Sequence, residues 1–480
     1  MPALTVAPRD GIRLDASTRA RLRARTERAV LRARRGGREV LAGITLALHP
    51  GVDPSAVVLA SRRGDEPWFC FEQPDRGGAA LAALGCVRRL QGGGPGRFGD
   101  AAASWRALAG RAEADSPDGP AGAGLVAVGG FAFADDGGTA PHWAGFASAD
   151  LVVPELALAR RGGDVRLTLA ALAAPDDDPA QLAARLEHRA ADLRSAPLPL
   201  LDPAPAGRFR IASVAPPEHY EAAVARAVER IRAGDFEKIV LAREVAVHAP
   251  ADHDVAAVYG VLRAAFESCY VFCAGRGDAA FIAASPELLV RREGLRASTV
   301  ALAGSTRRSA DPAVDDHLGE QLMRSEKDRS EQEIVTRRIA RALRPHSVWV
   351  AAPDEPAIVK VANIQHLATP IRAQLTHPRS TIELAGLLHP TPAVGGEPHA
   401  AAAPRIPAFE GIDRGWYAGP VGWTDANEDG EFCVALRCAL LRGEEARLYA
   451  GVGVVRDSDP AAELAETEVK LGALLPVLSG

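Results

Sequence analysis

The chain has 480 residues, which allows one large domain or two to three smaller ones. Apolar residues make up 47% and charged residues 24%, a balance typical of globular proteins that excludes general disorder. A net charge of −5 gives no basic field for DNA, RNA or an anionic membrane, so we expect none of them as a partner. No apolar run reaches about 18 residues and the N-terminus lacks signal-peptide order, which predicts a cytoplasmic protein.

The first part of the chain predicts an α/β or β-rich region. Residues 16–35 carry arginines at helical spacing and predict a solvated helix. Residues 56–61, 124–133 and 164–171 alternate or run apolar, as strands do. No cluster of acids, lysine or histidine stands in this region, so we assign it a supporting role. Periodicity then disappears in the proline-rich stretch 195–208, which predicts a linker or a long crossing.

Helices and strands alternate after this stretch. Proline at position 460 suits the first turn of a helix, because its fixed φ is helical. The predicted elements are a helix at 218–233, a strand at 237–247, a long charged helix at 316–343, a helix at 383–388, a strand at 430–441 and a final helix from Pro460.

The six cysteines are spread too thinly for a disulfide scaffold, so we expect reduced thiols. Cys269 with Cys273, and Cys433 with Cys438, are spaced as metal pairs could be. Both pairs lie in apolar runs without histidines, which favours core residues.

Lysine is scarce in this chain. Of 56 basic residues, only Lys238, Lys327, Lys360 and Lys470 are lysine, and arginine fills all other positions. Unlike a guanidinium, a buried amine can lose its proton, so the remaining lysines are candidates for positions that need an amine. Chance survival is the alternative for any single one of them.

Two segments gather carboxylates on one helical face. Asp328 and Glu331 are three residues apart, and Glu463, Glu466 and Lys470 follow at i, i+3 and i+7. Carboxylates without nearby Cys or His are the ligands that Mg²⁺ accepts. Spacing alone favours the alternative of solvated acidic faces.

Lys238 and Glu287 are candidates for a base and an acid. Lys238 stands in an apolar strand, where desolvation would favour the neutral amine of a general base. Glu287 is also embedded among apolar residues, and burial would raise its pKa towards that of a general acid. A buried ion pair is the alternative for each residue.

Ten ordered segments resemble the chorismate-utilising enzymes, a family that includes isochorismate synthase, salicylate synthase and anthranilate synthase component I. The resemblance covers about residues 212–478, and WFCFEQPDRGG and GGFAFA extend it towards the N-terminus as in longer isochorismate synthases. The segments are FEKIVLAREV, AASPELLV, ALAGSTRR, SEKDRSEQEIV, NIQHLATPI, LLHPTPAVGG, IDRGWYAGPVGW, GEFCVALRCALL, LYAGVGVVRDSDP and ELAETEVK.

The resemblance implies an α/β (α+β) fold like that of anthranilate synthase component I. Two α/β halves with antiparallel sheets would pack around a central cleft. Residues 1–205 would form a supporting region of the same fold, and residues 206–480 the chorismate-binding catalytic domain. We expect a monomer.

The resemblance also assigns site residues. Glu331 and Glu466 match the Mg²⁺ ligands, with Asp328 and Glu463 supporting them through water, and the metal would hold the ring carboxylate of chorismate. Other positions match groups that bind the substrate's carboxylates or line its ring; they are Gly304, Ser305, His366, Thr391, Tyr417, Arg437, Ala450, Gly451, Gly453 and Lys470.

Within the family, lysine at position 238 points to water as the nucleophile. The matching lysine activates water for attack at C2, while the glutamate matching Glu287 protonates the hydroxyl that leaves C4. Ala303 stands where aminodeoxychorismate synthases carry a nucleophilic lysine, which excludes their covalent route. These residues favour isochorismate synthase, a Mg²⁺-dependent isomerase.

Two other functions stay open. Salicylate synthase, which goes on to eliminate pyruvate from isochorismate, shares the base and the acid. An inactive chorismate-binding homologue would lack a metal carboxylate, the base or the acid, and none is missing. One departure from the family is Gln332, where many members carry histidine, and we expect it to change the support around the metal ligands.

Overall fold

The computed structural model describes residues 11–116, 118–202, 205–361 and 364–480, which form two large antiparallel sheets. The first ten residues, part of the segment compared above with a signal peptide, lie outside this description. One sheet has 12 described strands, in the order β1-β8-β7-β3-β2-β11-β12-β21-β22-β10-β18, with β9 beside β10. The other has 10 described strands, in the order β15-β17-β14-β13-β20-β19-β5-β6-β4, with β16 beside β17.

The strands of the 12-stranded sheet are β1 (Val40–Leu48), β2 (Trp68–Gln73), β3 (Ala79–Leu84), β7 (Leu156–Arg161), β8 (Asp164–Ala173), β9 (Arg210–Ser213), β10 (Lys238–His248), β11 (Tyr270–Arg276), β12 (Ala279–Ser285), β18 (Gly396–Glu397), β21 (Cys438–Arg442) and β22 (Glu445–Val454). Those of the 10-stranded sheet are β4 (Arg88–Gly92), β5 (Val126–Phe131), β6 (Ala149–Val153), β13 (Leu288–Glu293), β14 (Arg296–Arg307), β15 (Ser347–Ala351), β16 (Ala357–Lys360), β17 (Ile364–Leu375), β19 (Pro420–Asp425) and β20 (Gly430–Val434).

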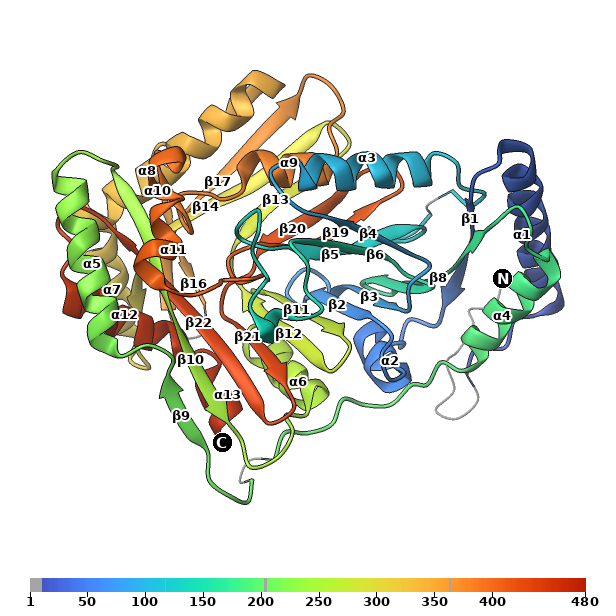
Figure 1. The fold of residues 1–480 in the computed structure, drawn as a ribbon, viewed down its shortest axis with the longest axis horizontal. Helices are drawn as coiled ribbons and strands as arrows, with labels where there is room; N and C mark the ends of the chain where they lie inside the picture. The colour runs from blue at the N-terminus through green and yellow to red at the C-terminus, as the bar shows by residue number, and fades with distance from the viewer. Residues whose placement is uncertain (1–10, 117, 203–204, 362–363) are drawn as a thin grey trace.

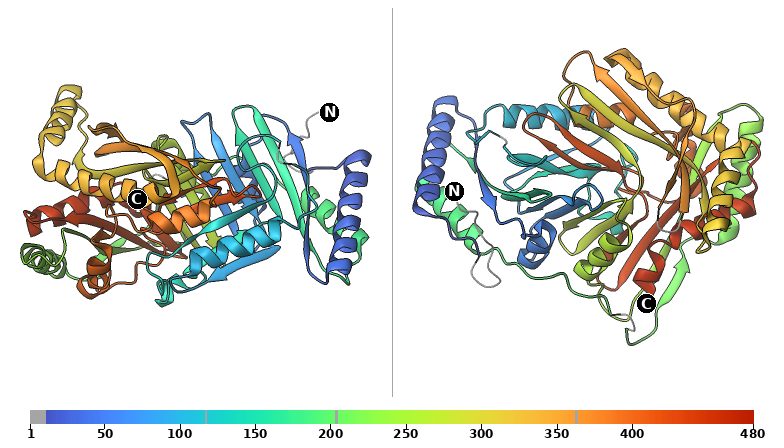
Figure 2. Two further views of the ribbon diagram at one scale, coloured as in Figure 1. Left: turned by 90° about the horizontal axis from the view of Figure 1, so that it is seen from above. Right: turned by 180° about the vertical axis from the view of Figure 1, so that it is seen from behind.

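Helices cover the outer faces and both ends of the molecule. In Figures 1 and 2, α1 and α4 lie at one end, and α5, α7 and α12 lie at the opposite end. Helices α3 and α9 pack against each other over the 10-stranded sheet, and α8 packs on β14 and β17. The helices are α1 (Ala16–Gly36), α2 (Pro54–Ser61), α3 (Arg97–Ala109), α4 (Pro179–Ala191), α5 (Pro217–Arg232), α6 (Val255–Ala265), α7 (Pro312–Arg324), α8 (Glu326–Leu343), α9 (Thr381–Leu388), α10 (His399–Ala402), α11 (Arg405–Glu410), α12 (Pro460–Leu471) and α13 (Leu475–Ser479), with 3₁₀ turns at Pro141–Trp143 and Arg344–His346.

The largest apolar core lies between the two sheets. It joins Phe71 of β2 and Phe281 of β12, from one sheet, with Phe131 of β5 and Phe432 of β20, from the other. A second core covers the other face of the 12-stranded sheet, where α2 and α6 pack. All six cysteines are free thiols. Buried positions are confirmed for the four that the sequence predicts as core residues, Cys269, Cys273, Cys433 and Cys438.

Each sheet contains strands from both sides of the proline-rich stretch 195–208. Strands β1, β2, β3, β7 and β8 precede it and pair into the sheet that also holds β10 and β22. Strands β4, β5 and β6 likewise join a sheet whose other strands follow it. The N-terminal strands therefore complete both sheets that the C-terminal half contributes to. No described helix is both long and apolar enough to cross a membrane.

Three predicted elements were wrong. Residues 56–61, predicted as a strand, lie in helix α2, which Pro54 begins and Asp53 caps by accepting from the Ala56 amide. A short buried apolar run has no period that separates a strand from a helix. The predicted helix 316–343 is two helices, because Ser325 has extended backbone (φ −66°, ψ 114°) and caps the start of α8.

The predicted strand 430–441 is also divided. Strand β20 belongs to the 10-stranded sheet and β21 to the 12-stranded sheet, so the chain changes sheets between Val434 and Cys438. Arg437 has a φ of +49°, a left-handed conformation that breaks the strand. The sequence does not indicate this break, because the strands before and after it, β20 and β21, are both largely apolar and buried. The break also places Arg437 beside the candidate active site.

Candidate active site

Most of the predicted site residues line one cavity where the two sheets meet helices α8 and α12. The cavity measures about 60 Å³. The predicted residues that line it are Glu287, Gly304, Ser305, Glu331, His366, Tyr417, Arg437, Ala450, Gly451, Gly453, Glu466 and Lys470. Lys238, Asp328, Thr391 and Glu463 lie outside this lining, and two of them contact lining residues: Lys238 pairs with Glu331, and Asp328 stands against Gly304.

Two neighbouring crossings between the sheets position Glu287 and Arg437. Glu287 lies between β12 of one sheet and β13 of the other, and Arg437 lies between β20 and β21. The Val434 amide donates to the Glu287 carbonyl at 3.0 Å, and the Ala284 amide donates to the Arg437 carbonyl at 3.1 Å. Backbone hydrogen bonds therefore tie the two crossings together and fix both side chains at the cavity wall.

Burial gives Glu287 the character of an acid. Its side chain lines the cavity and is only 3% exposed. Burial raises its pKa to about 8, against the opposing charges of Lys238, Arg437 and Lys470. The carboxyl is therefore protonated at neutral pH and can donate a proton, as the sequence predicts from its apolar neighbours.

Lys238 is buried and paired with a carboxylate. Its Nζ lies 2.7 Å from Oε1 of Glu331, which α8 carries. Gly453 of β22 leaves the space for this pair, since a Cβ there would stand 2.2 Å from the same Glu331 oxygen and 2.8 Å from Lys238 Cε. The predicted base, Lys238, is therefore in direct contact with a predicted metal ligand, Glu331.

A second lysine–carboxylate pair lies on α12. Lys470 Nζ is 2.9 Å from Glu466 Oε1 and donates to the Gly451 carbonyl at 2.9 Å. The Ser305 hydroxyl donates to Glu466 at 2.7 Å. Although burial opposes it, the Lys470 charge lowers the pKa of Glu466, which is therefore ionised. The cavity beside these two ion pairs, at about 60 Å³, is therefore much smaller than a typical ligand pocket, which measures about 300 Å³ or more.

Asp328 and Glu463 lie behind the cavity wall. Lys327 Nζ is 2.6 Å from Glu463 Oε1, a contact that joins α8 to α12. Asp328 accepts from the Ser325 hydroxyl and stands against Gly304, at a bulge of β14 where a Cβ would be 3.0 Å from the Asp328 Cβ. Sequence reasoning assigned no partner to Lys327, although lysine is so rare in this chain that its presence was a signal.

The carboxylates suit a hard cation by their chemistry. Glu331 and Glu466 both face the cavity, and carboxylate oxygens are the ligands that Mg²⁺ accepts together with water and substrate. Among the described residues, no group of three or more His, Cys, Asp or Glu side chains is placed to hold a metal. The donor set therefore fits a cation held by two carboxylates, with the substrate and water supplying the other ligands.

His366 is neutral and has a defined hydrogen-bond pattern. Its Nδ1 lies 3.3 Å from the Gly304 carbonyl, and its Nε2 lies 3.5 Å from Arg437 Nη2. Burial, together with the charges of Arg437 and Lys470, lowers its pKa to about 3. Because a carbonyl only accepts and a guanidinium only donates, the proton is on Nδ1. His366 thus orients Arg437.

Two stacked tyrosines form another wall. The rings of Tyr417 and Tyr449 are 5.3 Å apart and stacked, and both line the cavity. A Cβ at Gly451 would stand 2.6 Å from the Tyr417 hydroxyl, so glycine permits this close approach. Sequence reasoning missed Tyr449, although it directly precedes the AGVGV segment. Its buried hydroxyl has no hydrogen-bond partner among the described residues.

Gln332 and Thr391 complete the surroundings. Gln332 Nε2 donates to the Ala301 carbonyl at 3.0 Å and to the Thr369 hydroxyl at 2.9 Å, which fixes α8 against β14 and β17. Thr391 is buried outside the cavity lining, and its hydroxyl has no hydrogen-bond partner in the described part of the chain. Gln332 therefore supports the helix that carries Glu331.

A buried acid, two lysine–carboxylate pairs and an arginine around one cavity define an enzyme site for a small anionic substrate. The family model described as chorismate binding enzyme matches residues 27–479. The chain belongs to this family, and the resemblance that the sequence motifs indicate is confirmed.

Individual relatives agree with this assignment. The salicylate biosynthesis isochorismate synthase of Pseudomonas aeruginosa is 39% identical over 465 residues, which cover 95% of this chain and 94% of the relative. The structure of the menaquinone-specific isochorismate synthase from Escherichia coli matches with a TM-score of 0.77 at 26% identity, over 94% of this chain and 99% of that one.

The expected fold class is also confirmed. Anthranilate synthase component I from Streptococcus pneumoniae matches with a TM-score of 0.60 at 23% identity, over 72% of this chain and 79% of that one. This likeness shows the shared α/β fold with its antiparallel sheets.

Proposed function

We propose that this enzyme converts chorismate to isochorismate in a reversible, Mg²⁺-dependent reaction. The observation that carries the proposal is the buried Glu287, held protonated in a cavity that also contains Arg437 and Lys470. Close relatives that bear the name isochorismate synthase support it.

Arg437 and Lys470 would bind the substrate's carboxylates, because ionised donors make strong hydrogen bonds to carboxylates. Tyr449, Ala450 and Gly451 line the same wall. Glu331 and Glu466 would hold Mg²⁺, supported by Asp328 and Glu463. The bound cation would supply positive charge to the ring carboxylate.

The reaction needs a base that activates water near C2 and an acid that protonates the hydroxyl on C4. Lys238 accepts a proton from water as its oxygen bonds to C2, and the ring double bond shifts. Glu287 donates its proton to the C4 hydroxyl, which leaves as water. One water is consumed and one released, so the reaction is an isomerisation. To act as a base, Lys238 must first leave Glu331 and lose the proton that its ammonium carries in that ion pair.

Salicylate synthase is the alternative, since the same acid and base would serve its first step. Chromatography of the products formed from chorismate with Mg²⁺, with and without EDTA, decides between them. We expect isochorismate alone, lost with EDTA. Salicylate with pyruvate would replace the proposal by salicylate synthase, and no product would favour an inactive homologue.

A further inference from the structure

A buried ion pair lies behind the wall of the catalytic cavity, the cavity of about 60 Å³ described above. It joins Glu410, the last residue of α11, to Arg414, and these residues are 5% and 4% exposed. Nε of Arg414 donates to Glu410 Oε2 at 3.0 Å, and Nη2 donates to Oε1. Neither residue lines the catalytic cavity. Because a buried guanidinium needs partners for its donors, the other contacts of Arg414 show what it holds in place.

The pair completes one edge of β10, the strand that begins with the proposed base Lys238. On this edge, β18 pairs with β10 only at its first two residues, and β9 only at its last four. In the gap, Nη2 of Arg414 donates to the Val240 carbonyl at 2.9 Å, and the Ala242 amide donates to Oε1 of Glu410 at 2.7 Å. Two side chains therefore make the hydrogen bonds that a neighbouring strand would make.

The same guanidinium holds other parts of the cavity wall. Nη1 of Arg414 donates to the Val394 carbonyl at 2.8 Å. Val394 and Val240 both line the catalytic cavity. The guanidinium also lies over the ring of Tyr417, 5.6 Å from its centre, and Tyr417 lines the cavity too. One side chain therefore contacts three lining residues that belong to three separate segments of the chain.

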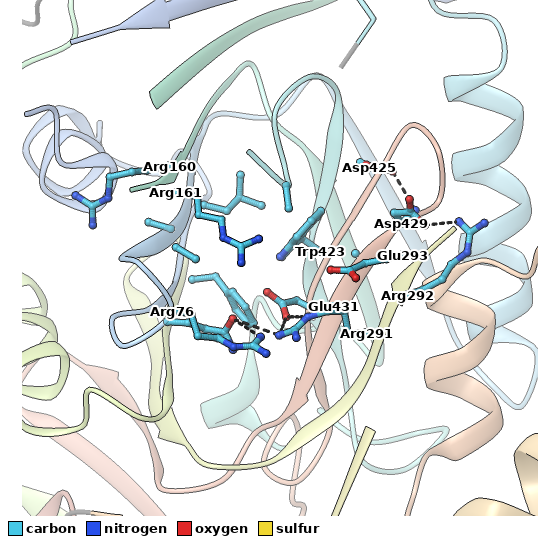
Figure 3. A pocket seen from close by; sticks show the side chains of 17 residues that line it. Arg76, Arg160, Arg161, Arg291, Arg292, Glu293, Trp423, Asp425, Asp429 and Glu431 are labelled. Atoms are coloured by element: carbon cyan, nitrogen blue, oxygen red, sulfur yellow. Dashed lines mark hydrogen bonds and ion pairs between the residues drawn. The ribbon is translucent and has the colours of Figure 1, made fainter. Parts of the chain in front are cut away.

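Other arginine–carboxylate pairs lie away from this wall. Figure 3 shows one of them, Arg291 with Glu431, on the lining of a separate cavity. Another joins the two sheets: Nε of Arg276 on β11 donates to Oδ2 of Asp150 on β6 at 2.6 Å, and the two residues are 3% and 0% exposed. None of these four residues lines the catalytic cavity. Arg276 therefore resembles Arg414 in burial and pairing but not in place.

We infer that Arg414 is a positioning residue for the proposed reaction, on which this inference rests. It holds β10, and with it Lys238, in place against Val394 and Tyr417, and Glu410 orients its guanidinium. Arg414 acts through these residues and not on the substrate. A lysine at this position can keep the ion pair but cannot reach both carbonyls, because an ammonium lacks the planar fork of a guanidinium.

Arg414→Lys tests this role, with Arg276→Lys as the matched control. Each change keeps the charge and removes the planar fork from a buried pair, so both should lower the melting temperature similarly. Hydrogen exchange measured by mass spectrometry should become about tenfold faster in residues 238–244 and 391–396, and only in Arg414→Lys. There kcat for chorismate should fall about 10–100-fold with KM changed less than about threefold, because a misplacement of about 1 Å slows catalysis strongly. Arg276→Lys should keep its kcat.

Two outcomes would overturn the inference. The first is unchanged exchange of residues 238–244 in Arg414→Lys. The second is an equal fall of kcat in both variants, which would make the role of Arg414 only structural. If Arg414→Lys does not fold, Glu410→Gln replaces it with Asp150→Asn as its control, because glutamine keeps the shape but loses the charge that orients the guanidinium. An unchanged protein inactive on chorismate would overturn the proposed function instead, and the exchange rates would still decide whether Arg414 holds the wall.

Discussion

Lys238 and Glu331 form a buried ion pair, with 2.7 Å between Nζ and Oε1. The lysine begins β10 and the glutamate lies on α8, so the contact joins a sheet to a helix across the candidate active site. In the proposed reaction, Lys238 acts as a base and Glu331 binds the metal, so this ion pair must open. Binding of Mg²⁺ would compete with Lys238 for the same oxygen.

Replacing Lys238 by Gln tests the base. Glutamine keeps a hydrogen-bonding side chain near Glu331 but accepts no proton, so we expect turnover of chorismate with water to fall about 10²–10⁴-fold, the range for loss of a general base. Thermal unfolding should show a folded protein. Lys360→Gln is the matched control, because Lys360 pairs with Asp315 and Asp316 and does not line the catalytic cavity. Full activity in Lys238→Gln would remove Lys238 from the mechanism.

The protonated state of Glu287 predicts a pH dependence of turnover. Its pKa of about 8 means that the acid loses its proton as the pH rises through 8, so kcat should fall above that pH. Glu287→Gln cannot donate, and its activity should be lower by about 10²–10⁴-fold at every pH. The pH profile of kcat for both proteins measures this. A constant kcat from pH 7 to 10 in the unchanged protein would contradict the acid role.

Glu287 should also make stability depend on pH. In the folded chain its pKa is about 8, against an ordinary value of 4.5. Between these values the folded state keeps a proton that the unfolded state releases, so stability falls as the pH rises from 4.5 to 8. Relative to Glu287→Gln, the unchanged protein should lose up to about 1.4 kcal/mol per pH unit in this window. Urea unfolding of both proteins at pH 5, 6, 7 and 8 measures the difference, and equal slopes would show that Glu287 is ionised when folded.

The sequence predicted the faces of helices better than the paths of strands. Periodicity placed Glu466 and Lys470 on one face of α12, and apolar neighbours predicted the burial of Glu287. Local patterns contain no sign of the two sheet crossings that hold Glu287 and Arg437, because both sides of each crossing are buried and apolar. The pairing of Lys238 with Glu331 joins residues 93 positions apart, so only the folded chain reveals it.

Gly453 tests the space around the lysine–carboxylate pair. A Cβ at this position would stand 2.2 Å from Glu331 Oε1, so Gly453→Ala must displace Glu331 or β22. We expect a loss of about 1–3 kcal/mol in the free energy of unfolding, as for other overpacked sites, and a large loss of turnover. Gly99→Ala is the control, since Gly99 lies in helix α3 with nothing within 4 Å of a Cβ. That change should stabilise the chain by up to about 1 kcal/mol, and a harmless Gly453→Ala would show that the pair tolerates displacement.

Glu466 and Glu468, both on α12, allow a test of the proposed metal site. Glu466 faces the catalytic cavity, whereas Glu468 is mostly exposed and pairs with Arg243. Glu466→Gln should raise the Mg²⁺ concentration needed for half-maximal turnover at least tenfold, because a carboxylate ligand becomes a neutral amide. Glu468→Gln should leave that concentration unchanged. Titration of turnover with Mg²⁺ after EDTA treatment measures both, and equal Mg²⁺ requirements in the two variants would mean that Glu466 does not bind the metal.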